Sequence, residues 1–221
     1  MTGILVFGTS VFSKKMAYHL ADAGQGNCAG FVVNEKYYDK PVFCGRNVYI
    51  LEQVKDYFDM SRTAILPSLG YSQMNQGRKE LFDYCHENGY KIASYISQEV
   101  INHAKSIGEG NIILDHVRLD HDCEVGEGNI IWPDAVLSHD VKVGNFNCIA
   151  ERVTFGGVSS LGDYNFVGMA AIVSNNVQVG DKNLIGAGAL VRQPLSTYTV
   201  VSPAESRVIQ ADEKMLSWML R

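Results

Sequence analysis

A large apolar residue recurs at every sixth position from residue 101 onward, in a series of sixteen members without an exception. A period of six fits no α-helix, but it is typical of a parallel β-helix in which every sixth side chain points inward from a flat face. Three hexapeptides make one triangular coil of 18 residues. One coil cannot bury its own interior, so we expect about five coils to stack. The members are Ile101, Ile107, Ile113, Leu119, Val125, Ile131, Leu137, Val143, Ile149, Phe155, Leu161, Val167, Val173, Val179, Ile185 and Val191.

A second pattern has a spacing of 18 residues and supports the same coil length. It consists of asparagines, which stacked coils would bring into one column. Asparagine tolerates a left-handed backbone, and its amide can bond the asparagine above or below, so we expect this column at a corner. The members are Asn111, Asn129, Asn147, Asn165 and Asn183.

The first 95 residues differ, because short β-rich runs alternate there with helical patterns. This order predicts a small parallel sheet with covering helices. Thr9 or Ser10 is a candidate N-cap of the first helix, and Asn88-Gly89 ends the last one. We expect strands at Ile4–Phe7, Cys28–Val33, Thr63–Leu66 and Lys91–Ile96, and helices after Ser10, at Leu51–Phe58 and at Met74–Glu87.

The change of pattern predicts three parts of the chain. They are an α/β domain over residues 1–97, a β-helix over residues 98–195 and a tail over residues 196–221. Within the tail, residues 211–220 predict a short amphipathic helix that packs on the assembled protein. Its apolar face would carry Met215, Trp218 and Met219.

Composition narrows the function classes. The chain has 221 residues, 46% of them hydrophobic and 19% charged, with a formal net charge of -5. This is ordinary for a globular protein and lacks the basic footprint of a nucleic-acid binder. No apolar run reaches about 18 residues, so we expect no membrane span. The start lacks a basic region, so we expect no signal peptide and a cytoplasmic location.

The cysteines and histidines are the candidate reactive side chains. The five cysteines are odd in number and include no CxxC, so we expect reduced thiols, mostly in the core, and no metal site. His103, His121 and His139 are spaced by 18, and the next member of their column is Gly157. Coils stack about 4.8 Å apart. We interpret the column as one catalytic histidine, next to a space at Gly157 that a narrow ligand chain could occupy. Surface or interface positions are the alternative, above all for His103 and His121.

Several segments resemble the hexapeptide-repeat sugar acyltransferases. The run Val-Leu-Ser-His-Asp-Val-Lys-Val-Gly at residues 136–144 looks like their active-site motif. These proteins include N-acetyltransferases of nucleotide-linked amino sugars and relatives known as sialic acid O-acetyltransferases. The resemblance implies a left-handed parallel β-helix of hexapeptide repeats behind a Rossmann-like α/β domain. Further matches lie at residues 155–157, 166–168, 184–191 and 202–204, and, for the front domain, at residues 69–75 and 89–97.

The resemblance also implies a mechanism of direct acetyl transfer from acetyl-CoA. His139 would be the general base, and Asp140 would orient its imidazole. The pantetheine arm would lie in a cleft between neighbouring β-helices of a homotrimer. No covalent intermediate is needed, so we do not assign Cys148 as a nucleophile. The residues expected along the arm are Gly157, Met169, Gly186 and Ala187.

The front domain would hold the nucleotide of a nucleotide-linked amino sugar used in surface polysaccharide or glycan synthesis. Gly8, Thr9 and Ser10 follow the first strand and open a helix, where N–H groups suit an anion. Asn34 and Glu35 end the second strand, a usual place for contacts to base or ribose. A capped turn without a ligand is the alternative, since the later glycines of the family's turn are missing here. The family's second histidine is also absent from residues 147–152.

Two other functions remain open from the sequence, and a third is disfavoured. A sugar O-acyltransferase would use the same histidine. A non-catalytic β-helix scaffold would need no intact Ser-His-Asp motif. A dinucleotide-dependent oxidoreductase is disfavoured because the fingerprint glycines are missing. The sugar, the nucleotide base, the amine position and the acyl chain are not specified by the sequence.

Overall fold

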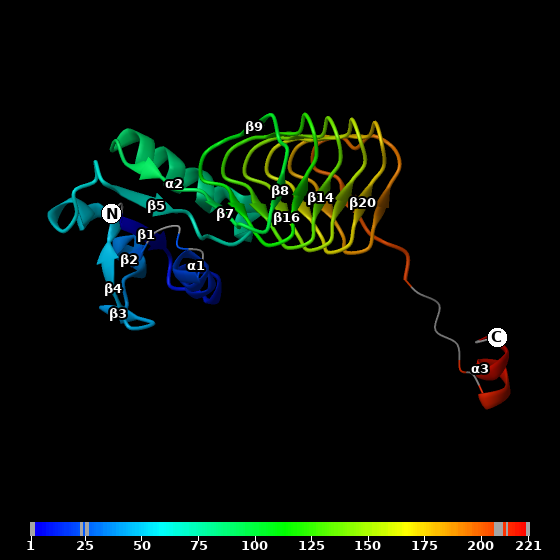
Figure 1. Ribbon diagram of the computed structural model, residues 1–221, viewed down its shortest axis with the longest axis horizontal. Helices are drawn as coiled ribbons and strands as arrows, with labels where there is room; N and C mark the ends of the chain where they lie inside the picture. Colours follow the sequence, from blue (N-terminus) through cyan, green and yellow to red (C-terminus); the bar gives the residue numbers. More distant parts are fainter. Residues whose placement is uncertain (1–2, 23, 25–26, 206–209, 211, 220–221) are drawn as a thin grey trace.

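The computed structural model describes residues 3–22, 24, 27–205, 210 and 212–219, and Figure 1 shows an α/β domain followed by a long coil of short strands. The predicted architecture, a Rossmann-like domain in front of a left-handed parallel β-helix, is confirmed. In the described part of the chain, no helix is long and apolar enough to cross a membrane. The same residues include no group of three His, Cys, Asp or Glu side chains arranged to hold a metal.

The front sheet has six strands in the order β3-β4-β2-β1-β5-β6, parallel except for the β3–β4 hairpin. Its buried strands β1, β2 and β5 confirm three predicted strands. The hairpin was not predicted, because β4 begins with two exposed polar residues and its short apolar run continues directly into the helix predicted from Leu51. The strands are β1 (Gly3–Phe7), β2 (Asn27–Val33), β3 (Val42–Phe43), β4 (Arg46–Ile50), β5 (Thr63–Leu66) and β6 (Lys91–Ile92).

The helices of the front domain lie close to their predicted positions. The helix predicted at Leu51–Phe58 is a shorter 3-10 helix, and a 3-10 turn precedes α2. The elements are α1 (Val11–Asp22), α2 (Gln76–Glu87), η1 (Glu35–Tyr37), η2 (Leu51–Asp56) and η3 (Ser72–Asn75).

The strand predicted over Lys91–Ile96 is wrong as a single strand. Lys91 and Ile92 form β6, which pairs with β5 of the front sheet. Tyr95 and Ile96 form β7, which pairs with β10 of the β-helix. The chain therefore passes from one sheet to the other within residues 93–94. An apolar run in the sequence does not show this change of partner.

The β-helix consists of two-residue strands in three parallel sheets. The first contains β7 (Tyr95–Ile96), β10 (Ile112–Ile113), β13 (Ile130–Ile131), β16 (Cys148–Ile149), β19 (Phe166–Val167), β22 (Leu184–Ile185) and β24 (Val200–Val201). The second contains β8 (Ile101–Asn102), β11 (Arg118–Leu119), β14 (Val136–Leu137), β17 (Thr154–Phe155), β20 (Ile172–Val173) and β23 (Leu190–Val191). The third contains β9 (Ser106–Ile107), β12 (Glu124–Val125), β15 (Lys142–Val143), β18 (Ser160–Leu161) and β21 (Gln178–Val179).

The inward series confirms the period of six, apart from its first member. From Ile113 to Val191 the predicted residues are at most 4% exposed and form one core. Ile101, however, is 48% exposed. The first coil is one residue shorter than the others, because Leu119 pairs with Asn102, 17 positions earlier. This deletion turns Ile101 away from the interior.

The asparagine column forms the predicted ladder, but not for both predicted reasons. Each Asn from Asn111 to Asn165 accepts the backbone N–H of the next through its Oδ1, at 2.7–2.8 Å, and all five are fully buried. The expected left-handed backbone is wrong for these asparagines. It belongs to the residue before each, such as Gly128 or Phe146, in a series spaced by six from Gly110 to Gly188.

The remaining predictions concern the thiols and the tail. All five cysteines are free, and all but Cys44 are buried. The predicted C-terminal helix is α3 (Glu213–Met219). Trp218 is 73% exposed, so it has no cover from the described part of its own chain. Residues 211 and 220 and the side chain of Met219 lie outside the described residues.

Candidate active site

His139 and Asp140 form a pair at the corner between the second and third sheets. Asp140 has a left-handed backbone with φ 58°, and its N–H donates to the carbonyl of His121 in the coil before. This geometry places Asp140 Oδ2 2.8 Å from His139 Nδ1. The side chains are 61% and 55% exposed, so the pair contributes little to stability. With Nδ1–H donating to the carboxylate, Nε2 has a free lone pair to accept a proton.

The imidazole of His139 lies over Gly157 of the next coil. A Cβ built on Gly157 would lie 2.4 Å from His139 Nε2 and 2.6 Å from Cε1. The space that the sequence suggested for a ligand chain is thus filled by the histidine ring. Gly157 has to lack a side chain for this ring position, and its contact with the pantetheine arm stays a prediction.

The other two histidines of the column stack on each other. The rings of His103 and His121 have centroids 4.5 Å apart and an interplanar angle of 21°. Two of the three predicted imidazoles therefore stack, even though the first coil is one residue short. The ring of His139 lies instead against Gly157 of the next coil, with Nε2 as its nearest atom.

The other residues predicted for the pantetheine arm lie at a different corner. Met169 follows β19, whereas Gly186 and Ala187 follow β22, so all three lie between the first and second sheets. His139 lies between the second and third sheets. About six residues of extended chain separate the two corners, which is roughly 20 Å at about 3.3 Å per residue. Within one chain, the structure does not bring these three residues to His139.

The five residues predicted for the nucleotide all line one cavity of about 950 Å³ in the front domain. It lies at the carboxyl ends of β1, β2, β4 and β5, where open parallel sheets bind ligands. The predicted members are Gly8, Thr9, Ser10, Asn34 and Glu35. Its other walls were not predicted, and they come from η2, from the segment leading into α2 and from α2 itself. These include Glu52, Leu69, Gly70, Gln73, Glu80 and Tyr84.

Glu52 shapes one side of this cavity. Its carboxylate accepts the side-chain amide of Asn34 at 3.3 Å and the backbone N–H of Glu35 at 3.1 Å. It therefore fixes the loop after β2. The signal for its role is its position after β4, a strand that the sequence did not reveal. The charged residues that line the cavity are Glu35, Lys36, Glu52 and Glu80.

Two backbone N–H groups of the turn after β1 donate hydrogen bonds to side chains of the same turn. The Ser13 N–H donates to Ser10 Oγ at 3.1 Å, and the Ser10 N–H donates to Ser13 Oγ at 3.4 Å. This is a reciprocal cap with serine at both ends. Two of the N–H groups that a helix start offers are thus already bonded, leaving those of Val11 and Phe12 for an anion. Gly8 has φ 98°, which suits glycine.

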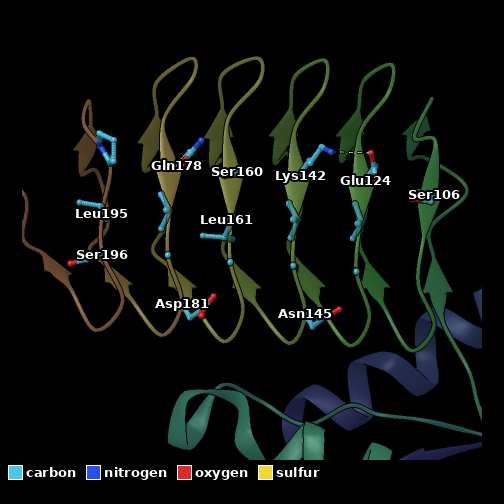
Figure 2. A pocket seen from close by; sticks show the side chains of 18 residues that line it. Ser106, Glu124, Lys142, Asn145, Ser160, Leu161, Gln178, Asp181, Leu195 and Ser196 are labelled. Carbon is cyan, nitrogen blue, oxygen red and sulfur yellow. Dashed lines mark ion pairs between the residues drawn. The ribbon is translucent and has the colours of Figure 1, made fainter.

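A second cavity, of about 1030 Å³, is an open groove on the third sheet of the β-helix. Figure 2 shows its polar side chains in one row, from Ser106 to Gln178. Lys142 Nζ lies 3.5 Å from Glu124 Oε1, and Lys105 Nζ lies 3.3 Å from the same oxygen. The hydrogen bond from Lys105 lowers the pKa of Glu124. The groove contains none of the predicted site residues.

Cys148 is not a nucleophile in this structure. It is 1% exposed on the outer face of the first sheet. Burial raises the pKa of its thiol to about 11, with Arg78 acting in the opposite direction. At neutral pH the thiol is protonated, and only the thiolate is reactive. This supports its exclusion from the mechanism.

The fold, a β-helix of hexapeptide repeats behind an α/β domain, can be compared with proteins of known structure. No family model matches the chain, and no curated protein matches it. Solved structures do match. The acetyltransferase domain of PglB from Neisseria gonorrhoeae FA1090, in complex with acetyl coenzyme A, has a TM-score of 0.79 and 20% identity, covering 92% of this chain and 98% of that one.

Two further structures have the same fold. PerB from Caulobacter crescentus, in complex with CoA and GDP-perosamine, has a TM-score of 0.68 and 20% identity, with 90% of this chain and 92% of that chain covered. WeeI from Acinetobacter baumannii AYE has a TM-score of 0.62 and 14% identity, with 89% and 94% covered. The predicted resemblance to sugar N-acetyltransferases of this type is confirmed at the level of the fold over nearly the whole chain.

Proposed function

We propose that the protein is an acetyl-CoA-dependent N-acetyltransferase that acts on a nucleotide-linked amino sugar. The observation that carries this proposal is the corner pair, with Asp140 bonded to Nδ1 of His139 and Nε2 left to accept a proton. The shared fold supports it, because the PglB and PerB structures contain acetyl coenzyme A or CoA, and that of PerB also contains GDP-perosamine.

The reaction proceeds by direct transfer. The neutral amine of the sugar attacks the thioester carbonyl carbon, and His139 Nε2 takes a proton from the attacking nitrogen. Asp140 stabilises the imidazolium that forms. The tetrahedral intermediate collapses with loss of the CoA thiolate, which takes the proton back from Nε2. No residue of the protein is acylated, since both substrates meet in one cleft.

Residues 1–97 would bind the acceptor in the front cavity. The carboxyl ends of β1 and β2 and the free N–H groups of Val11 and Phe12 suit a phosphorylated ligand. Asn34 and Glu35 would contact the base or ribose. Residues 98–195 would carry out the transfer, and the tail from residue 196 would support the assembly.

A homotrimer would complete the site. The residues that line the front cavity all come from the front domain, and Met169, Gly186 and Ala187 lie at another corner from His139. A neighbouring copy can supply the missing wall of the cleft. Met169, Ile172 and Leu190 are 56%, 45% and 47% exposed, and Ile172 pairs with Leu190 on the outer face of the second sheet. Such exposed apolar surface is typical of an interface.

We propose a cytoplasmic location, with a role in surface polysaccharide synthesis.

Free-thiol release from acetyl-CoA tests the function with a panel of UDP-, dTDP- and GDP-linked 3-amino and 4-amino sugars. We expect release with one amino sugar and its loss in His139→Asn. Release only with hydroxyl sugars would replace the proposal by an O-acyltransferase. No release with any acceptor, together with no acetyl-CoA binding by calorimetry, would leave a non-catalytic scaffold.

A further inference from the structure

Arg78 on α2 is a buried cation that joins the front domain to the β-helix. It is 1% exposed, and no ion pair involves it among the residues that the structure describes. Burial lowers its pKa to about 10, so it stays charged at neutral pH. Its guanidinium donates to five carbonyl oxygens, of Leu69 (3.1 Å), Gly70 (3.0 Å), Gly128 (2.9 Å), Phe146 (3.4 Å) and Asn147 (3.1 Å).

These five acceptors belong to two different parts of the molecule. Leu69 and Gly70 lie in the loop after β5 and line the front cavity. The other three carbonyls belong to consecutive coils at the corner between the third and first sheets. One planar group therefore holds the wall of the cavity against the β-helix. A guanidinium has five donors in a fixed fork, so it specifies an orientation as well as a contact.

The segment between Gly70 and Arg78 contains a strained backbone. Gln73, Met74 and Asn75 have φ of 51°, 50° and 66°, three successive left-handed residues without a glycine. Such a backbone persists only when its surroundings enforce it. Asn75 is 1% exposed and donates its amide to the carbonyl of Asn165 at 3.4 Å, while its Oδ1 has no partner. Gln73, at the start of this turn, lines the cavity.

Apolar contacts also join the two parts, but they do not fix an angle. Phe82 meets Phe146 with ring centroids 5.0 Å apart, and Tyr71 meets Phe166 at 4.9 Å. The free energy of apolar burial depends on area and is non-directional, whereas hydrogen bonds weaken steeply when misaligned. Arg78 donates three hydrogen bonds to the β-helix, whereas Asn75 donates one at 3.4 Å and the pair of His86 and Glu109 is half exposed. Arg78 therefore makes the largest directional contribution to the rotation of the front domain on the β-helix.

We propose that Arg78 is a positioning residue, which holds the front cavity in one orientation on the β-helix and so sets where a bound acceptor presents its amine. It contacts neither substrate, and its effect on transfer rests on the proposed function. A displacement of about 1 Å at the reacting atoms costs on the order of 100-fold in rate. Loss of Arg78 should thus lower kcat while the cavity still binds nucleotide.

The test compares Arg78→Met and Arg78→Lys with Arg62→Met, which removes an exposed arginine of the same domain. Three quantities are measured for each full-length variant. They are the Kd for UDP, GDP and dTDP by calorimetry, kcat and KM for the nucleotide-linked amino sugar, and amide hydrogen exchange of residues 67–77. Lysine keeps the charge but cannot bond five carbonyls, so it serves if the methionine variant does not fold.

We expect both Arg78 variants to bind nucleotide within about threefold of the control, to lose about 100-fold in kcat, and to exchange faster at residues 67–77. Control-like kcat and exchange would overturn the proposal. Loss of nucleotide binding and of kcat together would overturn it too, because Arg78 would then only maintain the fold. If the parent protein transfers no acetyl group, the proposed function fails, and exchange and nucleotide Kd alone decide whether Arg78 holds the cavity wall.

Discussion

Replacing Gly157 by alanine should inactivate the protein without unfolding it. The added methyl group would lie 2.4 Å from His139 Nε2, well inside van der Waals contact. The backbone of residue 157 is not left-handed, so alanine adds no backbone strain there. The atoms that the methyl meets belong to the end of an exposed side chain, which can swing into solvent. The ring, and not the coil, therefore moves.

The expected magnitude follows from this displacement. Moving the imidazole breaks its 2.8 Å bond to Asp140 or removes Nε2 from its place over the next coil. A positioned general base contributes about 10²- to 10⁴-fold in rate, so we expect kcat to fall at least about 100-fold, or about 2.7 kcal/mol in activation free energy. The free energy of unfolding should change by less than about 0.5 kcal/mol, as for other changes at exposed side chains.

Thiol release from acetyl-CoA measures kcat, and urea unfolding measures stability. Val158→Ala is the matched control, because Val158 lies at the same corner, is 52% exposed and leaves the ring of His139 untouched. A Gly157→Ala protein with the kcat of the control would show that the ring position over Gly157 is irrelevant to transfer. A protein that loses stability as well would show that the coil, and not the ring, gives way.

Three further predictions test the ladder, a buried thiol and the assembly. Asn147→Ala leaves the buried N–H of Asn165 without its 2.7 Å acceptor and should lower the free energy of unfolding by about 1–3 kcal/mol in urea; an unchanged value would refute the ladder's role. Because burial raises the pKa of Cys148 to about 11, the unfolded thiol loses its proton first, so stability should fall between about pH 9 and 11, and less so in Cys148→Ala. Leu190→Glu should convert the trimer to monomer in light scattering and reduce transfer, whereas a monomeric parent protein would contradict the assembly.

Much of the β-helix could be predicted because its information is periodic. An inward position every six residues and an asparagine every 18 require only that successive coils stack, and the structure confirms both. The same register predicted one column of three histidines, of which His103 and His121 stack. Prediction failed where the period slips by one residue, at Ile101, since a deletion leaves no mark in a series of apolar residues.

The cavity residues that directly follow predicted strands could also be predicted from the sequence. Gly8 to Ser10 and Asn34 to Glu35 follow buried strands, and parallel strands end at one edge of a sheet. Glu52 was missed because it follows β4, whose short apolar run continues directly into the helix predicted from Leu51.

The sequence by itself determined the repeat, the coil length, the order of domains and the candidate base. Only the tertiary structure decided that the His139 ring fills the space over Gly157 and that Arg78 bonds carbonyls some 50 to 69 positions away along the chain. The physical reason is that periodic burial depends on each residue's own place in the chain. Side-chain direction and contact between domains depend on how two independently formed surfaces meet.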